Sequence, residues 1–217
     1  MTDTHTKSGP GRPAGTDSGD TRQRVIDAAC QCFAQHGYGP TTNNLIAKIA
    51  GVTAGSVYYH FGTKSKLFEA VCEDVYGKII ARTARALAGP HSVSGLLRVV
   101  LDESMRINHE SPDLAGFVAA APIDARRHPE LADAFAAQAV RVTETLTLAV
   151  REGQRGGLIP ADHDPVQVAH VVNAIIAGFA ELSAGRDPAA MDAITELFEA
   201  LLLDPGNGSA DQPTKPR

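Results

Sequence analysis

The sequence predicts an all-α protein in which a small three-helix domain is followed by a larger helical domain. Apolar residues recur at helical spacing almost throughout, and no strand-like alternation lasts beyond a few residues. Pro112, Pro129, Pro165 and Pro188 each stand where a helix should begin. Proline suits the first helical position, because the N–H there has no intrahelical partner. With 217 residues, of which 43% are apolar, the chain can bury a core.

The predicted small domain spans residues 20–71 and contains three short helices. The first begins near Asp20 with the sequence of a capping box and ends in a Gly-Tyr-Gly-Pro turn. Thr42 and Thr53 are placed to cap the second and third helices, and Gly51 permits the left-handed turn between them. Two short helices joined by such a corner indicate a helix-turn-helix.

A connecting helix at about residues 64–88 leads into the larger domain, residues 72–204, which is expected to be helical. The Gly-, Pro- and Ser-rich ends, residues 1–19 and 205–217, are expected to be disordered. The helices of the larger domain are predicted at 93–109, 112–121, 129–153, 165–184 and 188–203.

Charge is distributed unevenly along the chain. Residues 1–68 carry seven Lys or Arg and four Asp, a net charge of +3, whereas residues 69–217 carry thirteen basic and twenty-one acidic residues, a net charge of −8. The basic end can approach nucleic acid while the acidic remainder repels it. No apolar run approaches the roughly 18 residues of a membrane span, and no signal core is present. We therefore expect a cytoplasmic protein without a membrane partner.

Residues 21–71 contain a set of features at fixed offsets: Ala28-Ala29, Phe33, Gly37, Thr41-Thr42, Ile49 to Thr53, Gly55, Val57 to Phe61, and Lys64 with Leu67. With these features the segment resembles the DNA-binding domain of the TetR family of transcriptional regulators. The resemblance implies a regulator, most often a repressor, that binds a near-palindromic double-stranded DNA operator as a homodimer and responds to a small-molecule effector.

The resemblance also implies the DNA contacts. Hydroxyl groups and free N–H groups at helix starts are suited to phosphate. The third helix has no Arg, Lys, Gln or Asn, so we expect little bidentate base readout and more reliance on thymine-methyl contacts and DNA shape. Arg12 in the Gly9 to Pro13 stretch is a candidate minor-groove contact, the alternative being a functionless tail. The candidate DNA-binding residues are Thr42, Asn43, Asn44, Thr53, Ala54, Gly55, Ser56, Tyr58, Tyr59, His60 and Lys64.

Two further sites are predicted in the larger domain. Helices 165–184 and 188–203 are apolar over wide faces, which indicates either burial within one chain or, as we prefer, a four-helix dimer interface. The candidate interface residues are Ala169, Asn173, Ile176, Ala177, Ala180, Ile194, Leu197, Phe198 and Leu201. The candidate effector-binding residues are Met105, Asn108, His109, Phe117, Phe135 and Gln138, although Met or Phe at helical spacing is also typical of a plain core.

Other functions are less well supported by the sequence. No arrangement of residues indicates catalysis, and no metal site or cofactor is predicted. A redox- or metal-responsive regulator would use Cys30, Cys32 and Cys72, but the first two point about 200° apart on one helix. An all-α interaction module that never binds DNA is the remaining alternative.

Overall fold

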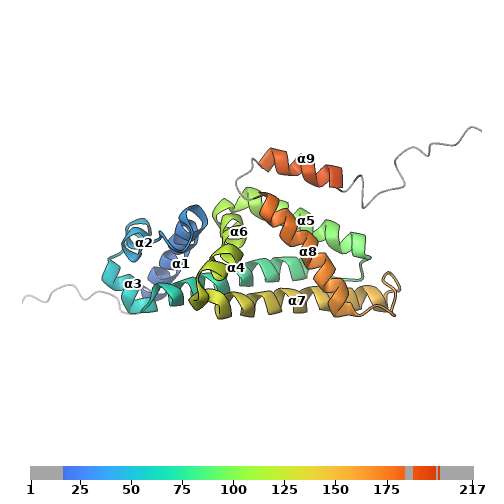
Figure 1. Cartoon of the computed structure of the whole chain (residues 1–217), viewed down its shortest axis with the longest axis horizontal. Coiled ribbons are helices and arrows are strands. Elements are labelled where there is room, and N and C mark those ends of the chain that lie inside the picture. The colour runs from blue at the N-terminus through green and yellow to red at the C-terminus, as the bar shows by residue number, and fades with distance from the viewer. Residues whose placement is uncertain (1–16, 184–187, 199, 201–217) are drawn as a thin grey trace, which may run out of the picture.

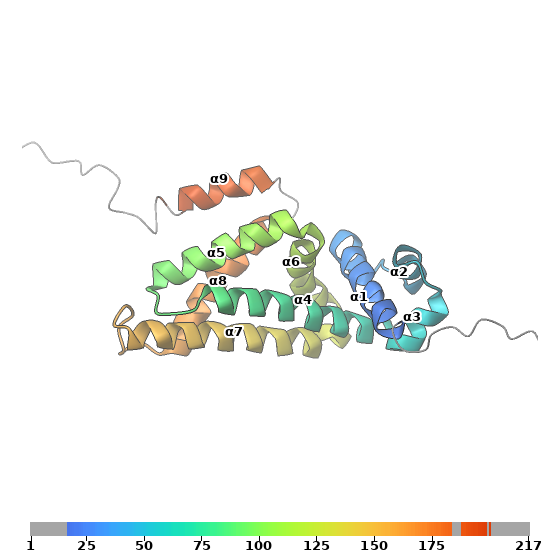
Figure 2. The same ribbon diagram turned by 180° about the vertical axis from the view of Figure 1, so that it is seen from behind.

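A computed structural model describes residues 17–183, 188–198 and 200. These residues form nine α-helices and one 3₁₀ turn, arranged as a three-helix head at one end of an elongated helical body (Figures 1 and 2). The all-α prediction is confirmed for them. The head comprises α1 (Asp17–His36), α2 (Asn43–Ala50) and α3 (Ala54–Phe61). The body comprises α4 (Lys64–Ala86), α5 (Val93–Glu110), α6 (Pro112–Arg127), η1 (Pro129–Leu131), α7 (Ala132–Arg155), α8 (Pro165–Ser183) and α9 (Pro188–Phe198).

Local signals in the sequence account for most helix boundaries. The four prolines open α6, η1, α8 and α9, as predicted. Threonine hydroxyls cap three helices: Thr42 accepts the Leu45 N–H at 3.2 Å and Thr53 accepts that of Ser56 at 3.1 Å. Thr63 caps α4 in the same way. Gly51 ends α2 with φ 67°, a left-handed conformation that favours glycine.

Two predicted boundaries need correction. Helix α1 begins at Asp17, so Asp20 lies inside it and forms an ion pair with Arg24 at 3.8 Å instead of capping it. Helix α6 continues through Pro122 to Arg127, whereas the sequence predicted an end at residue 121. Proline removes one hydrogen bond, but the turn that follows buries Asp124 and Ala125, and this packing keeps the helix intact.

The head and the body share a core. Phe33 of α1, Phe68 of α4 and Phe117 of α6 form an aromatic cluster with ring centroids 5.3 to 6.3 Å apart. Helix α1 approaches α6 closely at Gly116, where an added Cβ would lie 3.1 Å from the Ala34 Cβ. The head is therefore packed directly against α6, although the sequence predicted a boundary near residue 71.

A second apolar cluster lies at the far end of the body, where Leu96, Leu97 and Val150 are buried. Helices α4 and α7 run side by side along the body, and α8 crosses them obliquely (Figures 1 and 2). Helix α9 lies mainly against α5. A cavity lies in the body between α4, α5, α6, α7 and α8.

Helix α8 exposes much of its apolar surface. Its segment Pro165–Leu182 is long and apolar enough to cross a membrane by length and composition alone, with a mean hydropathy of 1.3, and only 11% of it is buried. The sequence prediction had considered only uninterrupted apolar runs, whereas Gln167, His170 and Asn173 interrupt this segment. The predictions for the Gly9 to Pro13 arm, the 205–217 tail and Leu201 concern residues outside those that the structure describes.

Candidate DNA-binding surface and ligand cavity

Helices α2 and α3 present their amino-terminal ends at the surface of the head. The first backbone N–H groups of an α-helix have no intrahelical acceptor, so they are available to an external anion. The hydroxyls of Thr42 and Thr53 each accept one of these N–H groups, and their own hydrogens stay available to donate. Asn44 and Thr53 are exposed, and Asn43 and Ser56 are partly buried. The starts of both helices therefore offer N–H and hydroxyl donors of the kind that phosphate accepts.

The outer face of α3 carries exposed aromatic rings and no Lys, Arg, Asp or Glu. Tyr58 is 68% exposed and Tyr59 is 82% exposed, whereas Val57 faces the core. His60 packs against the rings of Tyr59 and Phe61. Exposed tyrosines at successive positions of a short helix serve no packing purpose in the head, so they favour contact with another molecule.

Gly55 lies at the start of this face. It is exposed, and a Cβ added there would meet only the Thr53 Oγ1, at 3.8 Å. The space beside it is open in the described structure, so glycine is not needed for packing within the head. A glycine at this position is better explained by close approach of the backbone of another molecule.

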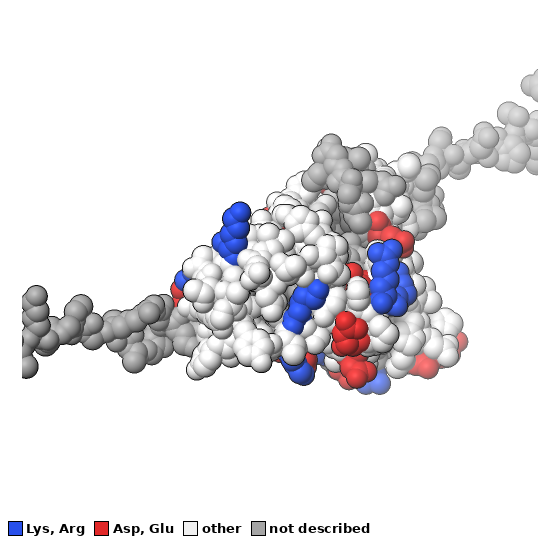
Figure 3. All heavy atoms as spheres, turned by 60° about the vertical axis from the view of Figure 1, so that its left-hand side comes forward, with Lys and Arg blue, Asp and Glu red and all other residues white. Residues whose placement is uncertain are grey.

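Cations are sparse around this surface. Figure 3 shows the head end of the molecule with Lys and Arg side chains well separated by uncharged atoms. Arg24 donates to the carbonyl oxygens of Ala50 at 2.6 Å and Gly51 at 3.1 Å, so it holds the carboxyl end of α2. Lys66 is paired with Glu69 at 2.6 Å. Lys48, which was not among the predicted DNA-binding residues, is exposed on α2.

The prediction that Lys64 reaches a phosphate requires correction. Its Nζ donates to the carbonyl oxygens of Tyr38, Gly39 and Thr41 at 2.8, 3.2 and 3.0 Å. All three ammonium hydrogens are thus directed at the turn between α1 and α2. Partial burial lowers the pKa of Lys64, with the charges of Glu130 and Asp124 acting in the opposite direction. In this structure Lys64 holds the head together.

A cavity of about 360 Å³ lies in the body between α4, α5, α6, α7 and α8. Its walls are mainly apolar. The polar lining groups include Tyr76, Asn108, Arg126, Asn173 and Glu181. The remaining lining residues are Ile79, Ile80, Thr83, Val100, Leu101, Ser104, Met105, Ile107, Ala115, Val118, Ala119, Pro122, Ile123, Phe135, Ala139, Val142, Thr145, Leu146, Ile176, Ala177, Phe179 and Ala180.

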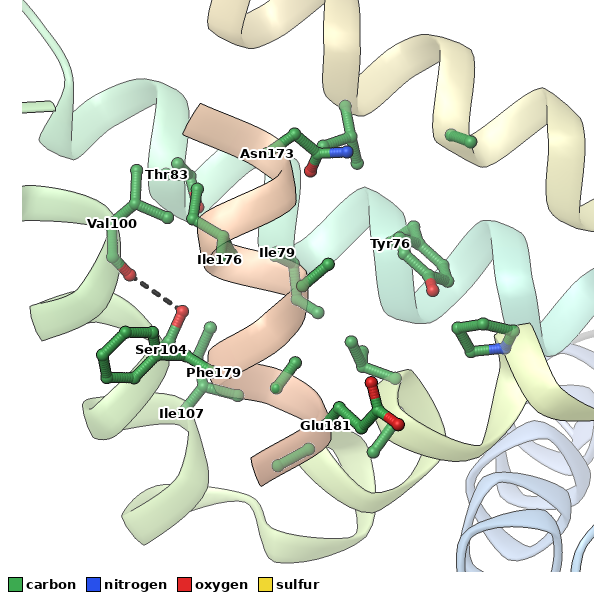
Figure 4. A pocket seen from close by; sticks show the side chains of 18 of the residues that line it. Tyr76, Ile79, Thr83, Val100, Ser104, Ile107, Asn173, Ile176, Phe179 and Glu181 are labelled. Carbon is green, nitrogen blue, oxygen red and sulfur yellow. Dashed lines mark hydrogen bonds between the residues drawn. The ribbon is translucent and has the colours of Figure 1, made fainter. Parts of the chain in front are cut away.

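Only some of the polar lining groups are free to meet a ligand. The Ser104 hydroxyl donates to the Val100 carbonyl at 2.8 Å, and the Thr145 hydroxyl donates to that of Arg141. Figure 4 shows Tyr76 and Glu181 extending from α4 and α8 into the same space. The Asn108 Nδ2 is buried without a hydrogen-bond partner among the described residues. An unpaired buried donor is unfavourable, so Asn108 favours a ligand that supplies an acceptor.

The structure separates the predicted effector-binding residues into two groups. Met105, Asn108 and Phe135 line the cavity. Phe117, His109 and Gln138 do not, which corrects their assignment: Phe117 is fully buried in the aromatic cluster, and His109 lies 3.4 Å from Asp192 of α9. The Gln138 side chain is buried and accepts a hydrogen bond from Arg141.

Sequence reasoning missed cavity residues on every helix of the wall, with more of them on α6 and α8 than on the other helices. Tyr76 lies on the helix at about residues 64–88, which the sequence predicted only as a connection between the two domains. Arg126 lies beyond the predicted end of its helix. Asn173, Ile176, Ala177 and Ala180 were assigned to a dimer interface, whereas all four line the cavity.

The other predicted interface residues are also placed differently. Ala169 is fully buried within the chain, and the Phe198 ring packs on that of Phe179 at 4.9 Å. Ile194 is partly buried. Leu197 is 59% exposed and remains a candidate for contact with a second copy.

The three cysteines are free and buried. Burial raises the pKa of Cys30 and of Cys72 to about 12, and it also raises the pKa of Cys32. At neutral pH a thiol with such a pKa is a thiolate in only about one molecule in 100,000. These properties disfavour a cysteine-based sensor.

The expected result is that an alkylating reagent near neutral pH labels none of the three cysteines in the native protein within an hour. The same reagent should label all three after unfolding. Mass spectrometry would count the labels. Rapid labelling of the native chain would restore the cysteine-responsive alternative.

A helix-turn-helix with a free aromatic face, joined to a helical domain with an internal cavity, defines a DNA-binding transcriptional regulator with a ligand-binding domain. Residues 25–71 match the family described as "Bacterial regulatory proteins, tetR family", and residues 95–204 match "BetI-type transcriptional repressor, C-terminal". The chain belongs to the TetR family. Its interpretation as an interaction module that never binds DNA is not supported.

The individual relatives share little sequence identity with this chain, but the similarity extends over most of its length. The HTH-type transcriptional regulator UidR of Escherichia coli (strain K12) is 24% identical over 147 residues, which cover 68% of this chain and 73% of UidR. FadR from Bacillus subtilis, solved in complex with stearoyl-CoA, is 21% identical with a TM-score of 0.67 over 81% of this chain and 96% of that one. A putative transcriptional regulator from Saccharomonospora viridis, solved in complex with choline, is 18% identical with a TM-score of 0.65 over 84% and 96%. At these identities the two structures establish the fold.

Proposed function

We propose that this protein is a repressor that binds a near-palindromic operator as a homodimer and releases it when a small molecule enters the cavity. The observation that carries this proposal is that α4 and α6 both line the cavity and both contact the head. A ligand that prefers one arrangement of these helices must bias the position of the head. DNA and ligand then affect each other's affinity reciprocally, typically by about 1 to 3 kcal/mol.

The cavity favours a small and largely apolar effector. Its walls offer aliphatic and aromatic side chains with a few polar groups, the usual composition of a site for an organic molecule. The Asn108 amide favours an oxygen or nitrogen acceptor on the ligand. Ligands as different as stearoyl-CoA and choline are bound by structural relatives, so the fold leaves the effector open.

The decisive experiment selects bound duplexes from a random DNA pool and then screens small molecules for release of the selected DNA. A symmetric selected site and at least one releasing compound are expected. Ala119→Phe would fill the cavity from α6 and should abolish the response to that compound while preserving DNA binding. Ala136→Phe, which alters an exposed position on α7 outside the cavity, should leave the response unchanged. A purified protein that selects no duplex would refute the regulator assignment.

We propose that the dimer forms through the outer face of α8 rather than through the residues of this helix that the sequence predicted. This face carries Val171, which is 58% exposed, together with the exposed small residues Ala174 and Gly178. A Cβ added at Gly178 would meet nothing within 4 Å, so another helix can approach closely there. Covering an apolar helix face of this kind with a second copy is favourable, because it removes apolar area from water.

Ala174→Glu should therefore convert the protein to a monomer at micromolar concentration, because two carboxylates would face each other across the twofold axis. Sedimentation velocity would measure this change. Operator affinity should fall by about 100-fold or more, because one head would bind one half-site alone. Ala136→Glu adds the same charge on an exposed face of α7 and should change neither property. A dimeric Ala174→Glu variant would refute this interface.

We further expect the protein to act in the cytoplasm, where its operator would be, and to have no catalytic activity. The related regulators support this expectation. The exposed apolar face of α8 is accounted for by the dimer, so no membrane partner is proposed.

A further inference from the structure

The turn between α1 and α2, residues 37–41, is held by groups that belong to the body. It leads directly into Thr42, the residue that caps α2. The position of this turn therefore fixes where the helix-turn-helix begins. Two charged residues of opposite sign contact it, Asp124 from α6 and Lys64 from α4.

Asp124 holds the turn by accepting a hydrogen bond from the backbone of the turn. Its side chain is only 6% exposed, and its Oδ2 accepts the Tyr38 N–H at 2.8 Å. A hydrogen bond to a buried carboxylate is stronger than one between neutral groups. The preceding residue, Gly37, has φ 75°, and a Cβ added there would lie 3.4 Å from the Asp124 Oδ1. The backbone at Gly37 and Tyr38 thus lies directly against the Asp124 carboxylate.

Lys64 holds the carbonyl groups of the same turn. Its Nζ donates to the oxygens of Tyr38, Gly39 and Thr41, and it also lies 4.1 Å from the centroid of the Tyr38 ring. The ring of His128, which follows α6, packs on Tyr38 at 4.9 Å. The turn is consequently attached to α4 and to α6 through separate sets of atoms.

Both attachments belong to helices that form the cavity wall. Asp124 lies between Ile123 and Arg126, which line the cavity, in one turn of α6. Lys64 is the first residue of α4, whose later residues Tyr76 and Ile79 line the opposite wall. A relative movement of α4 and α6 must therefore either carry the turn with one helix or break its attachment to the other.

We infer that Asp124 and Lys64 form a clamp on residues 37–41 and that this clamp, by tying the turn to both helices at once, sets the orientation of the head on the body. Both are positioning residues, because they contact the turn and neither lines the cavity. The consequence for regulation rests on the proposed function: a ligand that separates α4 from α6 would open the clamp. The clamp itself requires neither DNA nor ligand.

Hydrogen–deuterium exchange of the full-length protein tests the clamp directly. Asp124→Ala removes the acceptor of the Tyr38 N–H, so exchange in residues 37–41 should be faster by about tenfold or more. Lys64→Met, which keeps an unbranched side chain but loses the ammonium, should accelerate the same segment. Asp124→Asn keeps an oxygen that can accept the N–H and should have a smaller effect than Asp124→Ala.

Matched controls exist on the same helices. Asp113 of α6 also contacts α1, through the Gln35 side chain at 3.4 Å, but it does not touch the turn. Lys66 of α4 is exposed and paired with Glu69. Asp113→Ala and Lys66→Met should leave exchange in 37–41 unchanged. Exchange in α7 should stay at its original rate in every variant, which would exclude general unfolding as the cause.

A DNA-binding experiment distinguishes a change in the orientation of the head from a loss of protein stability. If the clamp sets head orientation, Asp124→Ala should weaken binding to a duplex with two half-sites by about tenfold or more while binding to a single half-site stays unchanged. Equal losses on both duplexes, or unchanged exchange in both Asp124→Ala and Lys64→Met, would overturn the clamp. Failure of the unaltered protein to bind any duplex would refute the proposed function instead, because the exchange result would still stand.

Discussion

Replacing Gly55 with glutamate is expected to abolish operator binding while leaving the fold intact. Gly55 is the second residue of α3, and the space around its Cα is open apart from the Thr53 hydroxyl. A carboxylate in the first turn interacts favourably with the helix dipole, so the head should be no less stable. Against DNA the same carboxylate would occupy space needed by a phosphate and repel its charge. We expect a loss of affinity of about 100-fold or more, measured by fluorescence anisotropy with the selected duplex.

Two variants control for this result. Gly55→Ala adds one methyl group without charge and should weaken binding only moderately. Ala136→Glu adds the same charge on the distant surface of α7 and should bind normally. Thermal unfolding of all three variants should match that of the unaltered protein within a few degrees. If Gly55→Glu bound the duplex within about threefold of normal, the outer face of α3 would not be the DNA-binding surface.

Because α3 carries no charged side chain, the head should make few ionic contacts with DNA. Lys64 and Arg24 are occupied inside the head, and Lys66 is paired with Glu69. Among the described residues of the head, Lys48 and Arg22, which lies over the Phe61 ring, are the cations left to displace counterions from DNA, so the contacts of the head should depend only weakly on salt. Backbone N–H groups, hydroxyls and the exposed rings of Tyr58 and Tyr59 must supply most of the contact.

Features set by a few adjacent residues were predictable from the sequence. Threonine caps, the left-handed Gly51 and the four helix-opening prolines act within one helical turn, so their effect can be read without knowledge of the rest of the chain. Pro122 shows the limit of this reasoning. It is a helix breaker by local rules, yet burial of the following turn of α6 outweighs the lost hydrogen bond.

Features that depend on which helices meet were not predictable. Phe117 and Phe135 have the same side chain and similar helical spacing, but one is in the core and the other lines the cavity. Periodicity shows which face of a helix is buried, and it does not show whether the facing space is filled. For the same reason Ile176 was placed in a dimer interface, although its face of α8 is directed at the cavity.

Phe117→Ala should therefore be among the most destabilising single substitutions in this chain. Its ring is fully buried between Phe33 and Phe68, where α1, α4 and α6 meet. Truncating such a residue typically costs about 3 to 5 kcal/mol, because the surrounding side chains cannot collapse into the space. For a chain of this length the midpoint of thermal unfolding should fall by roughly 10 °C. Calorimetry would measure both quantities.

Phe135→Ala is the matched comparison, because its partly buried ring faces an existing hollow and packs on Tyr76 with centroids 6.2 Å apart. Truncation there should enlarge the cavity at a smaller cost of about 1 to 2 kcal/mol and alter the response to effector. Phe117→Ala should instead affect folding of the head and α6 together, because both share the aromatic cluster. The Phe117→Ala variant could instead unfold at the original temperature and yet bind the effector differently. In that case the assignment of Phe117 to the core would be wrong, and the effector would have to reach the surface of α1.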